Sequence, residues 1–291
     1  MKISRFCWFL LLFLPTTAFA TGQASDVIYV DGQKWWLMGR PVGADSTLYV
    51  NLQARLPELV QESTANWDRF VGYWSLDGEW LVLDSIVCTV YEDSTYKKDY
   101  EMSLPQATMS EVFGNYYRDG KIVATWLTGK IRLAQGKMLL YEHMGWNRHN
   151  ETEMILEVKE GRVVGRTLYH NRMVVDGFYF DEDAPMEKWN EFRRGFLPVL
   201  ERYHVFDTLS GIYISVSREV VDSLGNMTDV KVEVKYHNYT NNPMPELTDA
   251  LAREFKQYLM SIRPWRVWYL NGQYTSLWQM WMIPFRKRDF Q

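Results

Sequence analysis

Residues 212–236 read IYISVSREVVDSLGNMTDVKVEVKY, and this stretch decides the expected architecture of the C-terminal part of the chain. Two runs rich in β-branched residues, 212–221 and 229–236, lie on either side of the tripeptide Leu224-Gly225-Asn226. β-Branched residues favour strands, and a glycine-centred tripeptide between two such runs is typical of a hairpin turn. We therefore expect two antiparallel strands here.

An amphipathic helix is expected after this hairpin. Apolar residues recur at the helical period between 247 and 262, and Glu246 and Asp249 lie in the first turn, where the helix dipole favours anions. Pro264 closes the helix. Residues 265–270 and 274–285 flank the turn Asn271-Gly272 and predict a second hairpin. The expected order is ββαββ, a small α+β domain over residues 205–291.

The preceding part, residues 21–204, is predicted to form a β-rich domain. Gly120, Gly129 and Gly136 each precede an apolar run, and they stand nine and seven residues apart. These spacings are too short for helical crossovers, so adjacent runs should pair as antiparallel hairpins. The expected fold class is α+β, with an antiparallel meander in the form of an open sheet or a partly closed barrel. Helices are expected over residues 53–62 and 185–194.

The first twenty residues have the features of an export signal. Lys2 and Arg5 precede an apolar run over residues 6–14, and Ala18-Phe19-Ala20 has the small-x-small pattern that signal peptidase reads. A helix needs about 20 apolar residues to cross a bilayer, so we expect cleavage after Ala20 and no transmembrane segment in the mature chain. The predicted location is periplasmic or otherwise extracytoplasmic.

Composition and charge restrict the partners and the chemistry. A chain with 47% hydrophobic and 15% aromatic residues is expected to be globular. Removal of Lys2 and Arg5 with the signal leaves 30 Lys plus Arg against 36 Asp plus Glu, a net charge of −6, which makes nucleic acid an improbable ligand. Cys88 is then the only thiol, and its β-type surroundings predict a buried strand position and not a nucleophile.

The C-terminal part resembles the TonB C-terminal domain family. The elements that carry the resemblance are Gly225, Val230-x-Val232, Leu247-x-x-x-Leu251, Arg263-Pro264-Trp265, Gly272 and Ile283-Pro284-Phe285. The resemblance implies the fold of that family and binding of an extended partner strand. The N-terminal part is similar to uncharacterised exported proteins of Bacteroidota, through Ser63-Thr-Ala-Asn-Trp67 and Tyr73-Trp-Ser-Leu76, and this similarity implies no activity.

The last predicted strand is the candidate binding surface. Side chains alternate between the two faces of a strand, so Trp278, Met280 and Met282 should lie on one face. Residues 277, 281, 283 and 285 should lie on the other, where the helix packs. A bare apolar patch of that size is rare on monomers, so the N-terminal part, a second copy of the chain or a ligand should cover the first face. The predicted binding residues are Trp268, Trp278, Met280 and Met282. The predicted function is non-enzymatic binding of a protein or peptide in the cell envelope, with strand addition as its mode.

Two alternatives stay open at this point. An extracytoplasmic metal-dependent hydrolase could use His143, His149 and Glu151, because imidazole and carboxylate groups suit zinc or proton transfer. Their spacing matches no established ligand signature, so we expect no catalytic residue, no metal site and no cofactor. The other alternative is a structural component of an envelope complex. Nothing in the sequence identifies the partner or the oligomeric state.

Overall fold

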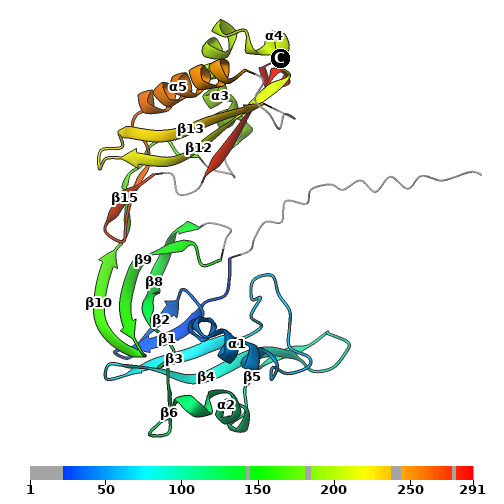
Figure 1. Ribbon diagram of the computed structural model, residues 1–291, viewed down its shortest axis with the longest axis vertical. Coiled ribbons are helices and arrows are strands. Elements are labelled where there is room, and N and C mark those ends of the chain that lie inside the picture. Colours follow the sequence, from blue (N-terminus) through cyan, green and yellow to red (C-terminus); the bar gives the residue numbers. More distant parts are fainter. Residues whose placement is uncertain (1–21, 142–144, 181–184, 237–243, 277–279, 291) are drawn as a thin grey trace, which may run out of the picture. The chain divides into compact units, whose positions relative to one another are not determined.

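The computed structural model describes residues 22–141, 145–180, 185–236, 244–276 and 280–290 (Figure 1). The predicted signal peptide and its cleavage site at Ala20 lie outside these residues. In the described residues, no helix combines the length and the apolar character that crossing a membrane requires.

Contacts divide the chain into two compact units. Unit 1 comprises Met1–Leu133, Leu140–Arg148 and Leu156–Gly165, and unit 2 comprises Ala134–Leu139, His149–Ile155 and Arg166–Gln291. This division does not follow the predicted boundary between residues 204 and 205. Helix α3 (Met186–Arg202) lies before that boundary, yet its Phe192 and Phe196 belong to the core of unit 2.

A ten-stranded sheet dominates the N-terminal half of the chain, and its strand order is β10-β9-β8-β2-β1-β3-β4-β7-β6, with β5 beside β4. Its strands are β1 (Asp26–Val30), β2 (Gln33–Leu37), β3 (Val71–Asp77), β4 (Trp80–Tyr91), β5 (Asp99–Ser103), β6 (Tyr117–Arg118), β7 (Lys121–Val123), β8 (Gly129–Tyr141), β9 (Arg148–Lys159) and β10 (Arg162–His170). The helical elements between them are η1 (Pro41–Ala44), α1 (Ser46–Gln53), α2 (Gln106–Phe113) and η2 (Gly114–Tyr116). The prediction of a β-rich, mainly antiparallel architecture is confirmed.

This sheet closes on itself through β10 and β4. Arg162 pairs with Trp80, and the Val163 N–H donates to the Glu79 carbonyl at 2.7 Å. The contact completes a ring of seven strands, from β10 through β9, β8, β2, β1 and β3 to β4, within the described residues. Because only one residue pair joins β10 to β4, the barrel is partly closed.

Three details of the predicted meander are wrong. Strand β1 pairs with β3 in parallel, because the segment from residue 38 to 70, which contains α1, is long enough for a crossover. Gly136 lies inside β8 with a φ of 80° and not in a turn, so the runs after Gly129 and Gly136 form one strand. The helix expected over residues 53–62 is instead α1, whose N-terminal amides are capped by the Asp45 carboxylate.

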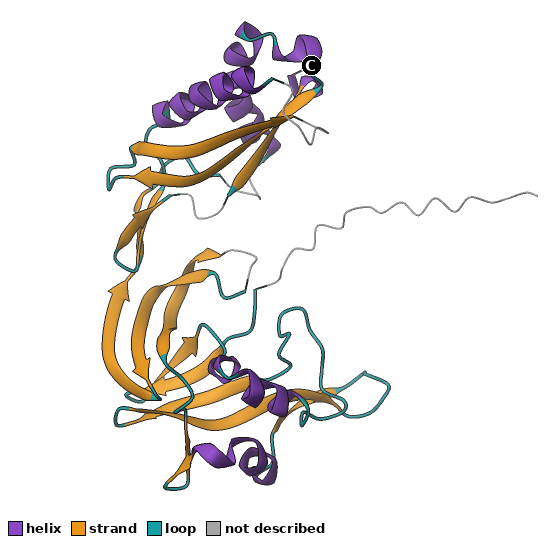
Figure 2. Ribbon diagram, in the orientation of Figure 1, coloured by secondary structure: helices purple, strands orange, loops and turns teal. Residues whose placement is uncertain are grey.

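Unit 2 contains two three-stranded sheets, with orders β13-β12-β16 and β11-β14-β15. Helices α3 and α5 cover one face of the first sheet (Figures 1 and 2). The elements are β11 (Arg172–Val175), α3, α4 (Val205–Thr208), β12 (Gly211–Val221), β13 (Met227–Tyr236), α5 (Pro245–Ser261), β14 (Val267–Leu270), β15 (Gln273–Thr275), β16 (Trp281–Arg286) and η3 (Lys287–Phe290). The predicted first hairpin and the helix after it are therefore confirmed, and the helix expected over 185–194 continues to Arg202.

Aromatic rings fill the core beneath α3 and α5. Phe196 of α3 meets Phe255 of α5 edge-to-face at 4.7 Å, and both lie within 6 Å of Phe285 of β16. Edge-to-face pairs add about 0.5–1.5 kcal/mol beyond area burial. The position of β16 under the helices is therefore set by its buried side chains.

The second predicted hairpin is correct only in its turn. Asn271-Gly272 joins β14 to β15, but β15 ends at Thr275 and this pair adds to β11. Strand β16 pairs with β12 instead, because Trp281, Ile283 and Phe285 belong to the core under the helices. The observed order is thus ββα followed by three strands in two sheets, and the specific resemblance to the TonB C-terminal domain stays a prediction.

Candidate functional site

The side chains of β16 alternate as the sequence predicts. Trp281, Ile283 and Phe285 are buried, whereas Met282 is 53% exposed, and Met280, just before the strand, is 61% exposed. The two methionines therefore lie outside the core that the opposite face of the strand helps to form. Thioether side chains adapt to differently shaped partners, which suits them to binding surfaces.

The backbone of β16 also presents hydrogen-bonding groups away from β12. In an antiparallel pair every second residue bonds to the neighbouring strand. The Lys287 N–H donates to the Ser210 carbonyl at 3.1 Å, so in the same register Phe285 and Ile283 bond to β12. Residues with the opposite parity point their N–H and C=O groups outward; these are Met282, Pro284 and Arg286. No other described strand pairs with β16, so these groups form an open edge, which we call the β16 edge.

Two features shorten the β16 edge. Pro284 has no N–H, and proline in a sheet is confined to positions where no ladder donor is needed. The Arg286 N–H donates to the Asp289 carboxylate at 3.2 Å. Among the outward amides of the strand, only that of Met282 is left to donate to an added strand.

The opposite edge of the same sheet belongs to β13 and has a different character. Tyr213, Ser215 and Ser217 of β12 pair with β13, so Val232 and Val234 point their backbone groups outward. We call this the β13 edge; within the described part of the chain no strand pairs with it. Charged side chains lie along β13 on the face opposite the helices, at Lys231, Glu233 and Lys235.

A cavity of about 450 Å³ lies where β16 ends. It is lined by Ser210, Gly211, Ile212, Tyr213, Arg286, Lys287 and Arg288. The Tyr213 side chain hydrogen-bonds Arg286 and raises the pKa of that guanidinium. Three cationic residues at one end of the β16 edge make this place suited to a carboxylate.

The other two predicted binding residues are not part of this surface. Trp268 is in β14 of the other sheet, is 5% exposed and packs edge-to-face on Tyr179 at 4.8 Å. It lies in the central strand of that sheet, between β11 and β15. Trp278 lies outside the described residues. The structure therefore keeps Met280 and Met282 together and separates Trp268 from them.

His149 and Glu151, predicted as possible metal ligands, do not converge. His149 Nδ1 lies 2.9 Å from Glu153 Oε2, and the fully buried Glu153 also accepts from the Asn271 amide at 2.7 Å. Glu151 is exposed and accepts from the Lys137 N–H at 2.9 Å. His143 lies outside the described residues, and no group of three His, Cys, Asp or Glu residues in the described chain could hold a metal ion. The cluster around Glu153 joins β9 to the β14–β15 turn, which is a structural role.

Cys88 is buried in β4, as its sequence context indicates. Burial raises the pKa of its thiol to about 11, so the thiolate is scarce at neutral pH. Both properties disfavour a nucleophile at this position.

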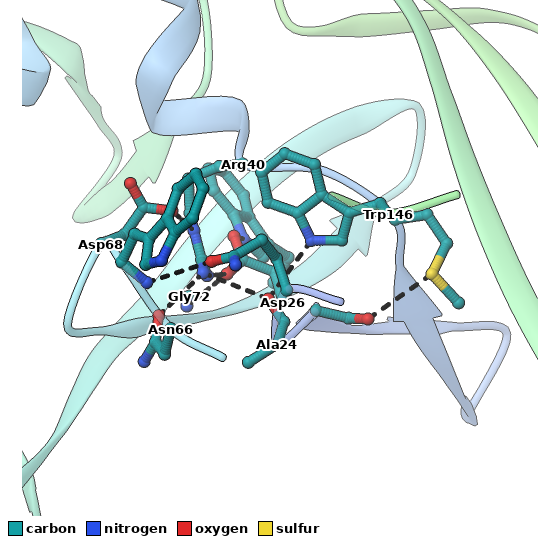
Figure 3. A network of polar contacts seen from close by, with 12 residues as sticks. Ala24, Asp26, Arg40, Asn66, Asp68, Gly72 and Trp146 are labelled. Atoms are coloured by element: carbon teal, nitrogen blue, oxygen red, sulfur yellow. Dashed lines mark hydrogen bonds and ion pairs between the residues drawn. The ribbon is translucent and has the colours of Figure 1, made fainter. Parts of the chain in front are cut away.

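A buried ionic network lies in unit 1 (Figure 3). Arg40 pairs with Asp26 and Asp68, and the Arg40 and Asp26 side chains are 4% and 0% exposed. Asp26 also accepts from the Gly72 N–H at 2.8 Å and the Trp74 indole at 2.9 Å. Burial raises the pKa of the Asp26 carboxyl, against the lowering effect of Arg40 and of these two donors. Charges at this depth are retained only when they are paired and hydrogen-bonded.

This network holds the loop at residues 63–69. Arg40 donates to the Asn66 side chain at 3.2 Å, and Gln53 of α1 donates to the Asp68 carbonyl at 2.9 Å. Gln23 accepts from the Trp67 N–H at 3.0 Å. The loop is thus fixed from the N-terminal segment, from Arg40 and from α1.

An open cavity of about 560 Å³ lies against the loop, lined by Gln53, Glu62, Ser63, Thr64, Asn66, Trp67 and Arg69. Trp67 is 64% exposed there. In the sequence, the segment 63–67 carries only a resemblance to exported proteins. Its partners lie at residues 23, 40 and 53, so no local pattern shows that they meet.

Comparison with known proteins adds no relative. No protein-family model matches the chain, and no curated protein or solved structure matches it either.

Proposed function

We propose that the mature protein binds an extended segment of a protein or peptide of the cell envelope, which adds as a strand to the β16 edge. The observation that supports this most directly is the Met282 amide, which points outward from an edge strand that exposes the Met282 side chain and follows the exposed Met280. In strand addition, main-chain hydrogen bonds provide affinity and alternate side chains provide specificity.

The β16 edge sets the length and chemistry of the added segment. Pro284 ends the row of outward donors, so the pairing is short and centres on Met282. A partner residue opposite Met282 meets an apolar thioether surface, which favours an apolar side chain there. An acidic group of the partner would be stabilised by Arg286, Lys287 and Arg288 at the end of the strand.

The proposed location is the periplasm or another extracytoplasmic compartment, after cleavage at Ala20. This part of the proposal depends on the sequence of residues 1–20. The hydrolase alternative gains no supporting arrangement from the described residues, because His149 is bound to Glu153 while Glu151 is bound elsewhere.

The test compares two proline variants of the mature chain, immobilised to capture proteins from native envelope extracts. Met282→Pro removes the outward N–H of the β16 edge without removing a hydrogen bond to β12. Val232→Pro removes the outward N–H of the β13 edge, and because the Val232 side chain also packs against the core, it serves as the control once its thermal melting matches that of the wild type. We expect a partner that the wild type and Val232→Pro both retain and that Met282→Pro loses. Unchanged thermal melting of both variants shows that the fold is intact.

Two outcomes would contradict the proposal. If Met282→Pro retains every partner of the wild type, the β16 edge does not bind a strand. Loss of the partner with Val232→Pro alone would place binding at the β13 edge instead. Met282→Ala separates the two contributions, because it removes the thioether side chain and keeps the amide. It should weaken capture and not abolish it.

A further inference from the structure

We infer that the cavity beside Trp67 in unit 1 is a binding site for a neutral pyranose ring of a saccharide. This inference is independent of the proposed strand addition, because the cavity and all residues that line it belong to unit 1.

Trp67 offers an apolar platform that the fold does not use for its own packing. Its side chain is 64% exposed, although the Trp67 N–H is tied to Gln23 Oε1 at 3.0 Å. A large indole that is attached to an anchored backbone and left in water favours ligand contact over core packing, because the flat ring can bury a large area on binding. The flat C–H face of a pyranose has the size and the apolar character to stack on such a ring.

Polar groups around the platform suit hydroxyl ligands. The Asn66 Oδ1 accepts from Arg40, while its amide Nδ2 has no partner among the described residues. Thr64 is exposed, and its hydroxyl has no hydrogen-bond partner among the described residues. The Thr64 carbonyl accepts from the Gln23 side chain. One amide donor and one hydroxyl thus line the same cavity as the indole, and sugar hydroxyls both donate and accept.

The charge of the cavity argues against ionic ligands. Its two ionisable lining residues, Glu62 and Arg69, form an ion pair at 3.7 Å and cancel each other's charge. A phosphate or a carboxylate would meet Arg69, whose charge Glu62 already neutralises. An ammonium group would meet Glu62, whose charge Arg69 already neutralises. A ligand that is uncharged, rich in hydroxyls and apolar on one face matches the site on all three counts.

The loop is prepared for binding before any ligand arrives. Arg40 holds Asn66, and Gln53 holds both the Asp68 carbonyl and the Arg69 guanidinium, the latter at 2.7 Å. The Ala24 N–H donates to the Ala65 carbonyl at 2.6 Å. A loop that is already ordered loses little conformational freedom on binding, which favours recognition of a small ligand.

The experiment titrates the full mature chain with neutral oligosaccharides: maltohexaose, cellohexaose, xylohexaose and chitohexaose. Binding is followed by isothermal titration calorimetry and by saturation-transfer NMR of the sugar ring protons. We expect at least one of them to bind at millimolar concentration or better. Trp67→Ala should weaken binding about tenfold or more, and Thr64→Val, which replaces the hydroxyl by a methyl group, should weaken it a few-fold.

Trp80→Ala is the matched control, because Trp80 is also exposed in unit 1, at 43%, and does not line the cavity. This variant should bind like the wild type. The inference fails if none of the four oligosaccharides binds at millimolar concentration. It also fails if Trp67→Ala, folded by circular dichroism, binds as well as Trp80→Ala. A preference for chitohexaose would indicate an N-acetylated glycan, whereas binding of the other three would indicate an unsubstituted one.

Discussion

The two edge strands of the β13-β12-β16 sheet differ in length, in charge and in whether a proline interrupts their row of backbone donors. Strand β13 has ten residues and charged side chains at Lys231, Glu233 and Lys235. Strand β16 has six residues, exposes Met282 and is interrupted by Pro284. Charged residues on an edge oppose unwanted pairing, and so does proline. Both edges are protected, but only β16 combines its protection with an apolar surface.

Under the proposed strand addition, this difference would let one sheet oppose aggregation and still bind a partner. The charges of β13 act along the whole strand. The proline of β16 acts at one position and leaves the Met282 amide available to a short partner. Under the proposed strand addition, Pro284 would exclude a long partner strand from β16, and a short apolar strand would fit.

The largest expected effect comes from a core substitution that destabilises the whole β13-β12-β16 sheet and therefore both of its edges. Phe255→Ala deletes a ring that contacts Phe196 and Phe285, and large-to-small changes of this kind cost about 3–5 kcal/mol. The free energy of unfolding in urea should fall by that amount. Capture of the partner should be lost at urea concentrations near the lowered midpoint of unfolding. A loss below about 1 kcal/mol would show that the aromatic core does not position the sheet.

The next prediction compares how strongly the buried side chains of the two edge strands stabilise the fold. Trp281 of β16 and Val234 of β13 are both buried on the helix-covered face. Trp281→Ala should cost about 3–5 kcal/mol, and Val234→Ala about 2 kcal/mol, since it removes two methyl groups at ~0.8 kcal/mol each and leaves a small cavity. Urea denaturation measures both. Equal losses would mean that the two edges are anchored alike.

Pro284→Ala should lengthen the β16 edge. The variant gains an outward N–H, and one additional hydrogen bond of about 1 kcal/mol corresponds to about fivefold tighter partner binding. The change should also increase self-association, measured by sedimentation velocity, because an edge donor that proline blocked becomes available. Unchanged affinity together with an unchanged sedimentation coefficient would argue against pairing at this edge.

Asp289→Ala should have the smallest effect. It releases the Arg286 N–H, now bound at 3.2 Å, at the end of the strand, where a short partner makes few contacts. We expect a gain of about twofold or less in partner affinity, worth ~0.4 kcal/mol. A gain larger than that of Pro284→Ala would show that the partner strand extends to the basic cavity and is longer than proposed.

Local patterns predicted the elements that depend on neighbouring residues. The hairpin of β12 and β13, helix α5 and the turn at Asn271-Gly272 all follow from β-branched runs, helical periodicity and turn residues. The alternation of Trp281, Met282 and Ile283 was predictable for the same reason, because strand periodicity is a local property.

Local patterns could not predict which strands pair when they lie far apart in the sequence. The local sequence after residue 272 is compatible with one long hairpin strand and also with two strands in different sheets. The second arrangement forms because Phe285 packs into the core under the helices, which is a long-range contact. The parallel pairing of β1 with β3 and the Arg40 network likewise join residues 14 to 48 positions apart. Gly136 looked like a turn because glycine marks both turns and strand irregularities.

Amide hydrogen exchange of the mature protein, resolved by residue, tests the central claim most directly. In the free protein the amides of Met282 and Val232 should both exchange fast, while Ile283, which bonds to β12, is protected. On adding the captured partner, we expect the Met282 amide to become protected and the Val232 amide to stay fast. A saturated complex in which Met282 still exchanges as in the free protein would contradict strand addition at the β16 edge.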